Sequence, residues 1–270
     1  MGASDLSPAG PTRRILTLGG HDFTSRSADR AICDFIVEMA GLPCPRVCLL
    51  PTASGDPAEQ TARFYNAFGD RKCEPTDLSL FRLGRKPVAV RDHLLSQDLI
   101  YVGGGSMVNL LAIWDAHEIG AMMALAWKRG IVLAGQSAGS MCWFEAGITR
   151  SSGESRAAAG LGLLPGSLCV HYHGEPDRRD AYLKAVARGM PGGHGLDDYA
   201  GLVWEGSTVT ESVSARRGSD VYRVTAIDGV ATEERLASRD LHPLDRDEIP
   251  ADIAEFRRAT RDRQRAGWLG

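Results

Sequence analysis

Short apolar runs alternate with amphipathic stretches along the first half of the chain. Gly, Pro or polar residues bound the apolar runs, which is typical of buried strands. These runs predict strands at residues 15–18, 47–50, 76–81, 99–102 and 131–134. The stretches between them place apolar side chains on one helical face, and they predict helices at residues 28–40, 57–68, 108–114 and 119–128.

This alternation predicts the fold class. Chains of this kind form parallel sheets whose two faces are covered by helices. We therefore expect an α/β fold, a three-layer sandwich with a mostly parallel central sheet. The functional edge of such a sheet lies at the carboxyl ends of its strands. Three glycine-containing loops leave predicted strands: Gly19-Gly20-His21, Gly103-Gly104-Gly105-Ser106 and Gly135-Gln136-Ser137.

The second half of the chain has a different pattern. It predicts strands at residues 168–173, 201–205, 208–214 and 221–227, and a helix at residues 179–188. A charged C-terminal helix is expected after about residue 250, over residues 251–265. Residues 1–11 predict a disordered segment. Because the chain shows no internal repeat and no strong linker, we expect residues 12–270 to form a single domain.

The composition argues against several classes of protein. The 270 residues carry a net charge of −3 without a dense basic block, which disfavours nucleic-acid binding. No apolar stretch approaches the ~18 residues of a membrane span, and the N-terminus lacks the apolar region of a signal peptide. The six cysteines show no metal-site spacing, and four of them lie in apolar contexts: Cys33, Cys48, Cys142 and Cys169. We expect a cytoplasmic protein with neither a membrane nor a nucleic-acid partner.

One stretch carries candidate chemistry. Gly135-Gln136-Ser137-Ala138-Gly139 directly follows a predicted strand, and residues 140–145 are expected to begin a helix. A serine on a sharp strand-to-helix turn presents its Oγ above the sheet edge, and small neighbours permit the strained turn. Ordinary glycine-rich turns show the same pattern, so the motif by itself does not establish a catalytic serine. A serine nucleophile also requires a general base, an orienting acid and oxyanion donors.

Histidine is the side chain best suited to take the serine proton near neutral pH. His171 and His173 end a predicted strand, and both would point to one face if the strand stayed regular. The pattern does not choose between them. The histidines predicted to be surface groups are His21, His93, His117 and His194. The candidate acids are Asp197, Asp198, Glu205, Glu154 and Glu175.

The Gly103-Gly104-Gly105 loop is a candidate source of oxyanion donors. Three glycines after a strand let backbone N–H groups approach a ligand, and one of them would act together with the N–H of Ala138. A phosphate-binding loop is the alternative. It is disfavoured because no Gly-Lys-Ser/Thr follows and no Gly-x-Gly-x-x-Gly opens a helix.

Between about Ile15 and Val224, a series of motifs occurs in a fixed order. They are Leu50-Pro51-Thr52-Ala53, Tyr101-Val102-Gly103-Gly104-Gly105 with Leu110-Leu111 and Trp114, Gly135-Gln136-Ser137-Ala138-Gly139, Cys142-Trp143-Phe144-Glu145, Leu161-Gly162-Leu163-Leu164-Pro165-Gly166 and His171-Tyr172. In this order they resemble the peptidase E family, which is serine peptidase family S51. The resemblance implies a relationship to cyanophycinases and a class I glutamine amidotransferase-like fold.

The resemblance also implies roles for particular residues. It implies Ser137 as nucleophile and His171 as base, with oxyanion donors from Gly104, Gly105 and Ala138. For the acid it favours Asp198, with Glu205 next. It implies a serine peptidase that hydrolyses short peptides, such as an aspartyl dipeptidase, and that needs no metal or organic cofactor.

Two departures from the family pattern bear on specificity. The family loop reads Gly-Gly-Gly-Asn-Thr where this chain has Ser106-Met107 after the glycines, and the aspartate expected shortly after the serine is absent from residues 149–152. Ser106 and Arg150 are therefore candidate substrate-binding residues. Arg150 would supply positive charge for an acidic substrate.

Two other functions stay open. An α/β-hydrolase-type esterase shares the serine turn but needs a late histidine, for which His242 is the candidate. A non-catalytic homologue would bind a small ligand on the same fold. We leave the oligomeric state open and note a homodimer as one option.

Overall fold

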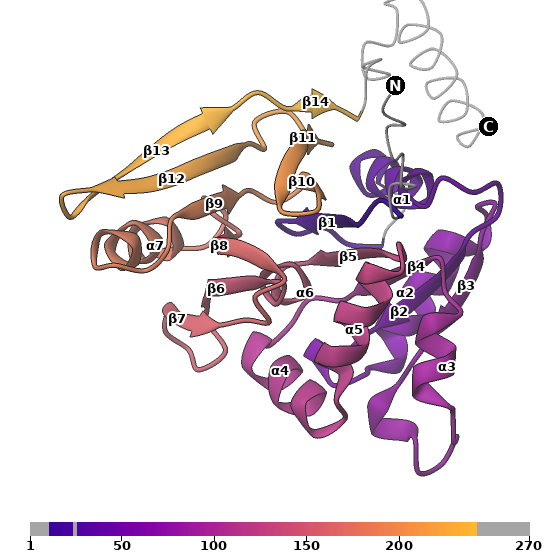
Figure 1. Ribbon diagram of the computed structural model, residues 1–270. Coiled ribbons are helices and arrows are strands. Elements are labelled where there is room, and N and C mark those ends of the chain that lie inside the picture. The colour runs from indigo at the N-terminus through magenta and orange to yellow at the C-terminus, as the bar shows by residue number, and fades with distance from the viewer. Residues whose placement is uncertain (1–10, 24–25, 242–270) are drawn as a thin grey trace, which may run out of the picture.

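A large, mostly parallel sheet forms the centre of the computed structural model, which describes residues 11–23 and 26–241 (Figure 1). Within these residues the sheet has eight strands in the order β14-β11-β10-β1-β5-β4-β2-β3. Its parallel strands are β1 Arg14–Leu18, β5 Val132–Gln136, β4 Leu99–Val102, β2 Arg46–Leu50 and β3 Glu74–Asp77. Beyond β1 lie β10 Ala200–Glu205 and β11 Thr208–Ser214, each antiparallel to its neighbour, and then the short β14 Arg239–Asp240.

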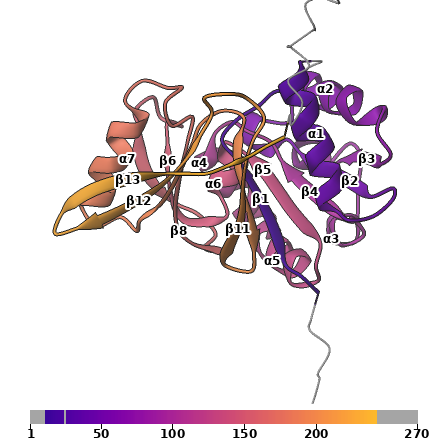
Figure 2. The same ribbon diagram turned by 90° about the horizontal axis from the view of Figure 1, so that it is seen from above.

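Helices cover both faces of this sheet (Figure 2). One face packs on α1 Ser27–Met39 and α2 Ala58–Gly69, and the other on α3 Val90–Leu95, α4 Met107–Ala116 and α5 Ile119–Lys128. Strand side chains alternate between the two cores, so Leu16 packs with α1 while Ile15 packs with the opposite helices. The predicted three-layer α/β fold is confirmed.

A second sheet lies beside the first. Within the described residues it has six strands in the order β13-β12-β9-β8-β6-β7. These are β13 Val230–Leu236, β12 Val221–Ile227, β9 Gly193–Leu196, β8 Leu164–Val170, β6 Phe144–Thr149 and β7 Arg156–Ala159. Helix α7 Arg178–Ala187 packs on one face through Tyr182 and Val186. The other face joins the core of the first sheet through Leu164 and Leu168.

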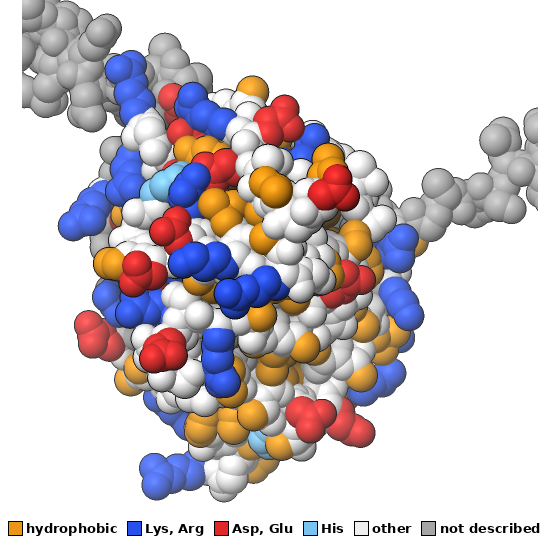
Figure 3. Space-filling view, turned by 90° about the vertical axis from the view of Figure 1, so that its left-hand side faces the viewer, with side chains coloured by type: hydrophobic (Ala, Val, Ile, Leu, Met, Phe, Trp, Pro, Cys, Tyr) orange, Lys and Arg blue, Asp and Glu red, His pale blue; other side chains and the backbone are white. Residues whose placement is uncertain are grey.

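The hairpin of β12 and β13 extends away from the first sheet (Figures 1 and 2). Asp228 and Gly229 at its tip both have positive φ, of 52° and 76°, as a two-residue hairpin turn requires. Figure 3 views the end of the molecule that bears this tip and α7. Acidic and basic side chains are interspersed there, so this face has no field of a single sign.

Several predicted elements agree closely with the structure. The strands at 99–102, 208–214 and 221–227 and the helix at 119–128 are confirmed to the residue. The strand predicted at 76–81 is wrong in its second part, because β3 ends at Asp77 and Leu80–Arg82 form a 3-10 turn. The helix expected after Ser137 is only the four-residue α6 Ala138–Met141. The helix expected at residues 251–265 lies outside the described residues.

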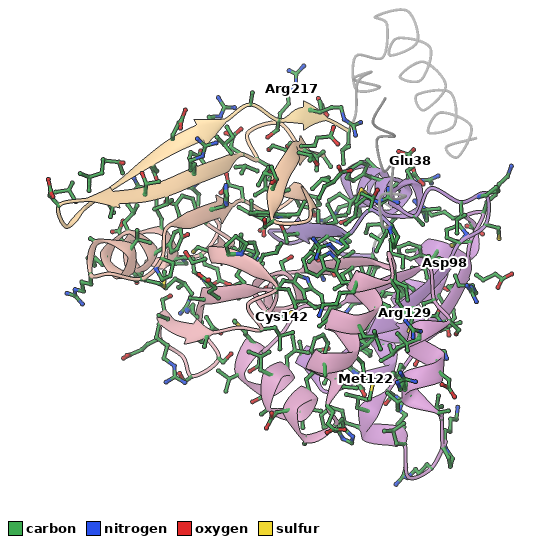
Figure 4. The ribbon with its side chains drawn as sticks, viewed as in Figure 1. Glu38, Asp98, Met122, Arg129, Cys142 and Arg217 are labelled. Carbon is green, nitrogen blue, oxygen red and sulfur yellow. The ribbon has the colours of Figure 1, made fainter. Side chains whose placement is uncertain are left out.

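The helix after Ser137 ends early because the chain enters the second sheet. Trp143 and Phe144 are fully buried, and β6 begins at Phe144. Cys142, labelled in Figure 4, lies directly after α6 in the core that the two sheets share. The sequence predicted that residues 140–145 begin a helix, whereas Met141, Trp143 and Phe144 are buried at the junction between the sheets. Local periodicity does not contain that information.

Candidate active site

Ser137 lies on a sharp turn between β5 and α6. Its φ of 52° and ψ of −119° are strained for a residue with a side chain, a conformation that typically costs about 1–3 kcal/mol. Its N–H donates to the Leu18 carbonyl at 3.1 Å. A Cβ at Gly135 would lie 2.1 Å from the Gly139 carbonyl oxygen, and one at Gly139 would lie 2.2 Å from that of Val102. The two flanking glycines are therefore required by close backbone contacts.

His171 meets Ser137 from the second sheet. Strand β8 ends at Val170, and His171 has a φ of 53°, which turns its ring toward the first sheet. Ser137 Oγ lies 2.8 Å from His171 Nε2. His173 does not share this direction, because the strand does not continue through His171. The regular strand that would have put both rings on one face ends before His171, and the two rings have different partners, Ser137 and Asp197.

Asp198 completes a line of three side chains. It lies in the turn between β9 and β10, and its Oδ1 is 2.6 Å from His171 Nδ1. The hydrogen bond from His171 holds the pKa of Asp198 below its ordinary value, although burial acts in the opposite direction. An ionised Asp198 accepts a hydrogen bond from the N–H at Nδ1, which leaves Nε2 free to accept from the Ser137 hydroxyl.

Glu205, the second candidate acid, is not part of this group. It is exposed at the end of β10, where it lies opposite Arg14 in the register of β10 with β1. Arg14 is the first residue of β1. Ser137 follows the carboxyl end of β5, which is parallel to β1, so Glu205 lies at the opposite edge of the sheet. Glu205 follows the candidate histidines in the chain, but the antiparallel pairing of β10 with β1 carries it away from them.

The glycine loop after β4 approaches Ser137 closely. A Cβ at Gly104 would lie 3.2 Å from Ser137 Cβ. Gly105 has a φ of 142°, and a Cβ there would lie 2.3 Å from the Ala53 carbonyl oxygen. Among the described residues, the backbone N–H groups of Gly104, Gly105 and Ala138 donate to no carbonyl. These donors are therefore available beside the serine.

A pocket of about 400 Å³ opens beside Ser137. It is lined by Gly105, Ser106, Ser137, Met141, Thr149, Arg150, Ser151, His171, Glu175 and Arg178. The Ser106 hydroxyl accepts from the Asn109 N–H at 3.1 Å, so it also caps α4. Arg150, which the sequence predicted as a substrate-binding residue, lies in the wall of this pocket. Its Nη1 lies 3.6 Å from Glu175 Oε2.

Two charged residues of this pocket were not predicted as binding residues. Arg178 is buried, and it donates to Glu175 and to the Ile148 carbonyl, each at 2.5 Å. Burial raises the pKa of Glu175, but the hydrogen bonds from Arg178 and the charges of Arg178, His171 and Arg150 outweigh it and lower the pKa overall. No local motif marks Arg178, because only the approach of α7 to β6 brings it to the pocket.

Two histidines predicted at the surface are withdrawn from it, His21 with its whole side chain and His194 in part. The His21 side chain is fully buried, and its Nε2 lies 2.7 Å from the Tyr101 hydroxyl. His194 lies against Trp204, with ring centroids 5.5 Å apart. His242, the late histidine of the esterase alternative, lies outside the described residues.

No group of three or more His, Cys, Asp or Glu among residues 11–23 and 26–241 is arranged to hold a metal ion. All six cysteines are free thiols. In the part of the chain that the structure describes, no helix is both long and apolar enough to cross a membrane.

The sequence and the fold are similar to those of known peptidases. The model of peptidase family S51 matches residues 15–212. An uncharacterized peptidase of Bacillus subtilis (strain 168), YgaJ, is 38% identical over 213 residues, which cover 78% of this chain and 92% of YgaJ. A crystal structure of a peptidase from an acI-B1 Actinobacterium has a TM-score of 0.60 at 17% identity and covers 86% of this chain and 97% of its own. A crystal structure of a Listeria monocytogenes EGD-e protein, proposed to be a peptidase E, has a TM-score of 0.56 at 16% identity. The match covers 76% of this chain and 100% of the Listeria chain.

Proposed function

Because the chain belongs to peptidase family S51, and is therefore a peptidase, we propose that it is a serine peptidase that hydrolyses short peptides. One observation carries the proposal. Ser137, His171 and Asp198 form a continuous hydrogen-bonded line, with distances of 2.8 Å and 2.6 Å. This line joins a nucleophile, a base and an orienting acid in the order that acyl transfer needs.

The reaction begins at the Ser137 hydroxyl. Its oxygen attacks the carbonyl carbon of the scissile amide, and His171 Nε2 takes the proton. Asp198 holds the other ring nitrogen and stabilises the imidazolium that forms. The N–H groups of Ala138 and of Gly104 or Gly105 donate to the developing oxyanion, which typically contributes a factor on the order of 10²–10³ per donor. The imidazolium protonates the leaving amine, and water then releases the acyl group with His171 as base.

The pocket supports a small substrate. A volume of about 400 Å³ is in the range of pockets that hold small ligands. Arg150 and Arg178 face a single carboxylate, Glu175, so these three residues together carry one net positive charge. An acidic group of the substrate would compete with Glu175 for Arg150. The free cysteines favour a reducing compartment, and we propose the cytoplasm.

Hydrolysis of a panel of dipeptides X-Leu, with X varied and Asp included, tests this proposal. We expect cleavage by the wild type and loss of cleavage in Ser137→Ala. Asp198→Asn should lower kcat by on the order of 10⁴, whereas Glu205→Gln, at the opposite sheet edge, should match the wild type. Undiminished hydrolysis by Ser137→Ala would refute the mechanism.

Specificity is read from the same panel. Cleavage confined to Asp-Leu would indicate an aspartyl dipeptidase, and cleavage of other members would indicate that Ser106 and Met107 have changed the preference. If no member is cleaved, a fluorophosphonate probe separates a reactive serine with a different substrate from a non-catalytic homologue. Labelling of the wild type but not of Ser137→Ala would support the first of these.

A further inference from the structure

A second histidine–aspartate pair lies directly beside the first. His171 pairs with Asp198, and His173 pairs with Asp197, so the two pairs use neighbouring positions of the same two segments. His173 Nδ1 lies 2.9 Å from Asp197 Oδ1. Neither His173 nor Asp197 lines the pocket at Ser137. The second pair is therefore placed to act on the first pair rather than on a substrate.

Asp197 is surrounded by donors. Its Oδ1 accepts from the His173 backbone N–H at 3.1 Å as well as from the His173 ring, and its Oδ2 accepts from the Asp220 N–H at 3.1 Å. Its own N–H donates to the Asp220 carbonyl, and its carbonyl accepts from Ala200. The side chain is only 9% exposed. The Asp197 carboxylate thus joins three segments of the chain: its own turn before β10, the residues after β8 and the residue before β12.

Two tyrosines orient the His173 ring, although 44% of its side chain is exposed. The ring makes edge contacts with Tyr172 and Tyr222, each with centroids 4.9 Å apart. Tyr172 in turn donates to Glu233 on β13 at 2.5 Å. The ring nitrogen therefore faces Asp197 because the second sheet holds the ring in place.

Both members of the catalytic pair lie outside the strand ladders. His171 lies beyond the last ladder residue of β8 and has a positive φ, and Asp198 lies in a turn between strands. Each is one or two residues from a member of the second pair. We propose that His173 and Asp197 are positioning residues, which hold the turn of His171 against the turn of Asp198 so that Nδ1 and Oδ1 stay at hydrogen-bond distance. This inference rests on the proposed roles of Ser137, His171 and Asp198.

Asp197→Asn is the sharpest variant. The carboxylate of Asp197 accepts hydrogen bonds from three N–H groups. An asparagine amide has the same shape, but its NH2 group would face one of these donors and that hydrogen bond would be lost. We expect kcat to fall roughly 10- to 100-fold, since a misplacement of about 1 Å costs on the order of 10² in rate, while KM changes less than about twofold. His173→Phe keeps an aromatic ring between Tyr172 and Tyr222 but removes the donor, and kcat should fall in the same direction.

Asp220→Asn is the matched control. It removes a neighbouring carboxylate, which pairs with Arg235 at 2.6 Å, but it keeps the backbone N–H that reaches Asp197. Its kcat should equal that of the wild type. If Asp197→Asn and His173→Phe lower kcat no more than Asp220→Asn does, the inference is wrong.

A spectroscopic readout makes the test independent of the peptide. The Nδ1 proton that His171 shares with Asp198 should give a resolved low-field proton NMR signal, assigned by its loss in Asp198→Asn. We expect Asp197→Asn or His173→Phe to shift or broaden this signal in protein that thermal unfolding shows to be folded. An unchanged signal in folded His173→Phe would overturn the inference, whereas a peptide panel without Ser137-dependent cleavage would count against the proposed function alone.

Discussion

Gly20 lies against both members of the His171–Asp198 pair. A Cβ at this position would be 2.5 Å from Asp198 Oδ1 and 2.6 Å from His171 Cε1. The Gly20 carbonyl also accepts from the Tyr199 N–H at 2.7 Å, which ties the loop after β1 to the turn of Asp198. Gly20 is not in a left-handed conformation, so space rather than backbone freedom requires a glycine here.

Gly20→Ala is expected to displace the pair with little cost elsewhere. The added methyl group must move Asp198 or His171, so kcat/KM for the peptide substrate should fall by on the order of 10². Steady-state kinetics together with thermal unfolding measure both effects. Gly84→Ala is the control, because nothing lies within 4 Å of a Cβ at Gly84. Equal activity of the two variants would contradict the assignment.

At the scale of elements, the short helix α6 links the nucleophile turn to two strands. Ser140 Oγ accepts from the Leu18 N–H at 2.8 Å and lies 2.5 Å from the Gly135 carbonyl oxygen, and it is fully buried. It thereby joins β1 and β5 beneath Ser137. A helix of only four residues has little stability of its own, so such tertiary contacts hold it in place.

Ser140→Ala should destabilise the fold by about 1–3 kcal/mol, because it leaves the buried Leu18 N–H without its acceptor. Chemical denaturation measures the change in the free energy of unfolding. Ser79→Ala serves for comparison. The buried Ser79 hydroxyl has no hydrogen-bond partner among the residues that the structure describes, so its removal should cost little. A loss in Ser140→Ala no larger than that in Ser79→Ala would disprove the link.

At the scale of the whole molecule, the site forms where two sheets meet. Ser137 and the glycine loop come from the first sheet, whereas His171 and the wall residue Arg178 come from the second sheet and its helix. His194 on β9 and Trp204 on β10 pack together across the same junction. Burial lowers the pKa of His194 from 6.5 to about 4, and the charge of Arg223 acts in the same direction.

This partly buried histidine predicts a loss of stability in acid. In the unfolded chain His194 regains its ordinary pKa of 6.5, so the unfolded state binds more protons than the folded state between pH 6.5 and pH 4. The stabilising effect of the neutral ring is complete above pH 6.5 and is lost as the pH falls toward 4. It amounts to about 2 kcal/mol by pH 5.

Urea unfolding of the wild type and of His194→Phe at pH 7.5 and pH 5 checks this expectation. Phenylalanine keeps an aromatic contact with Trp204 but cannot take up a proton. The wild type should therefore lose about 2 kcal/mol more than the variant over this range. Equal losses in the two proteins would show that His194 is not the titrating group.

The sequence by itself determined the alternating α/β layers and the serine turn, because both depend on local patterns. Apolar runs such as Leu99–Val102 must be buried wherever they lie. Gly135 and Gly139 permit the turn at Ser137 because they leave room for backbone close by, that of Gly139 and that of Val102 on the neighbouring strand. The resemblance to a family added His171 and favoured Asp198, and the geometry brings both to Ser137.

Only the tertiary structure decided which distant residues share the site. It separated His173 from His171 through a change in backbone direction, and it sent Glu205 to the opposite edge through the antiparallel pairing of β10. It also brought Gly20, Glu175 and Arg178 to the catalytic residues. It buried the His21 side chain and packed the partly buried His194 against Trp204. These outcomes depend on how the second sheet packs against the first, which is a sum of long-range contacts that no local pattern in the chain encodes.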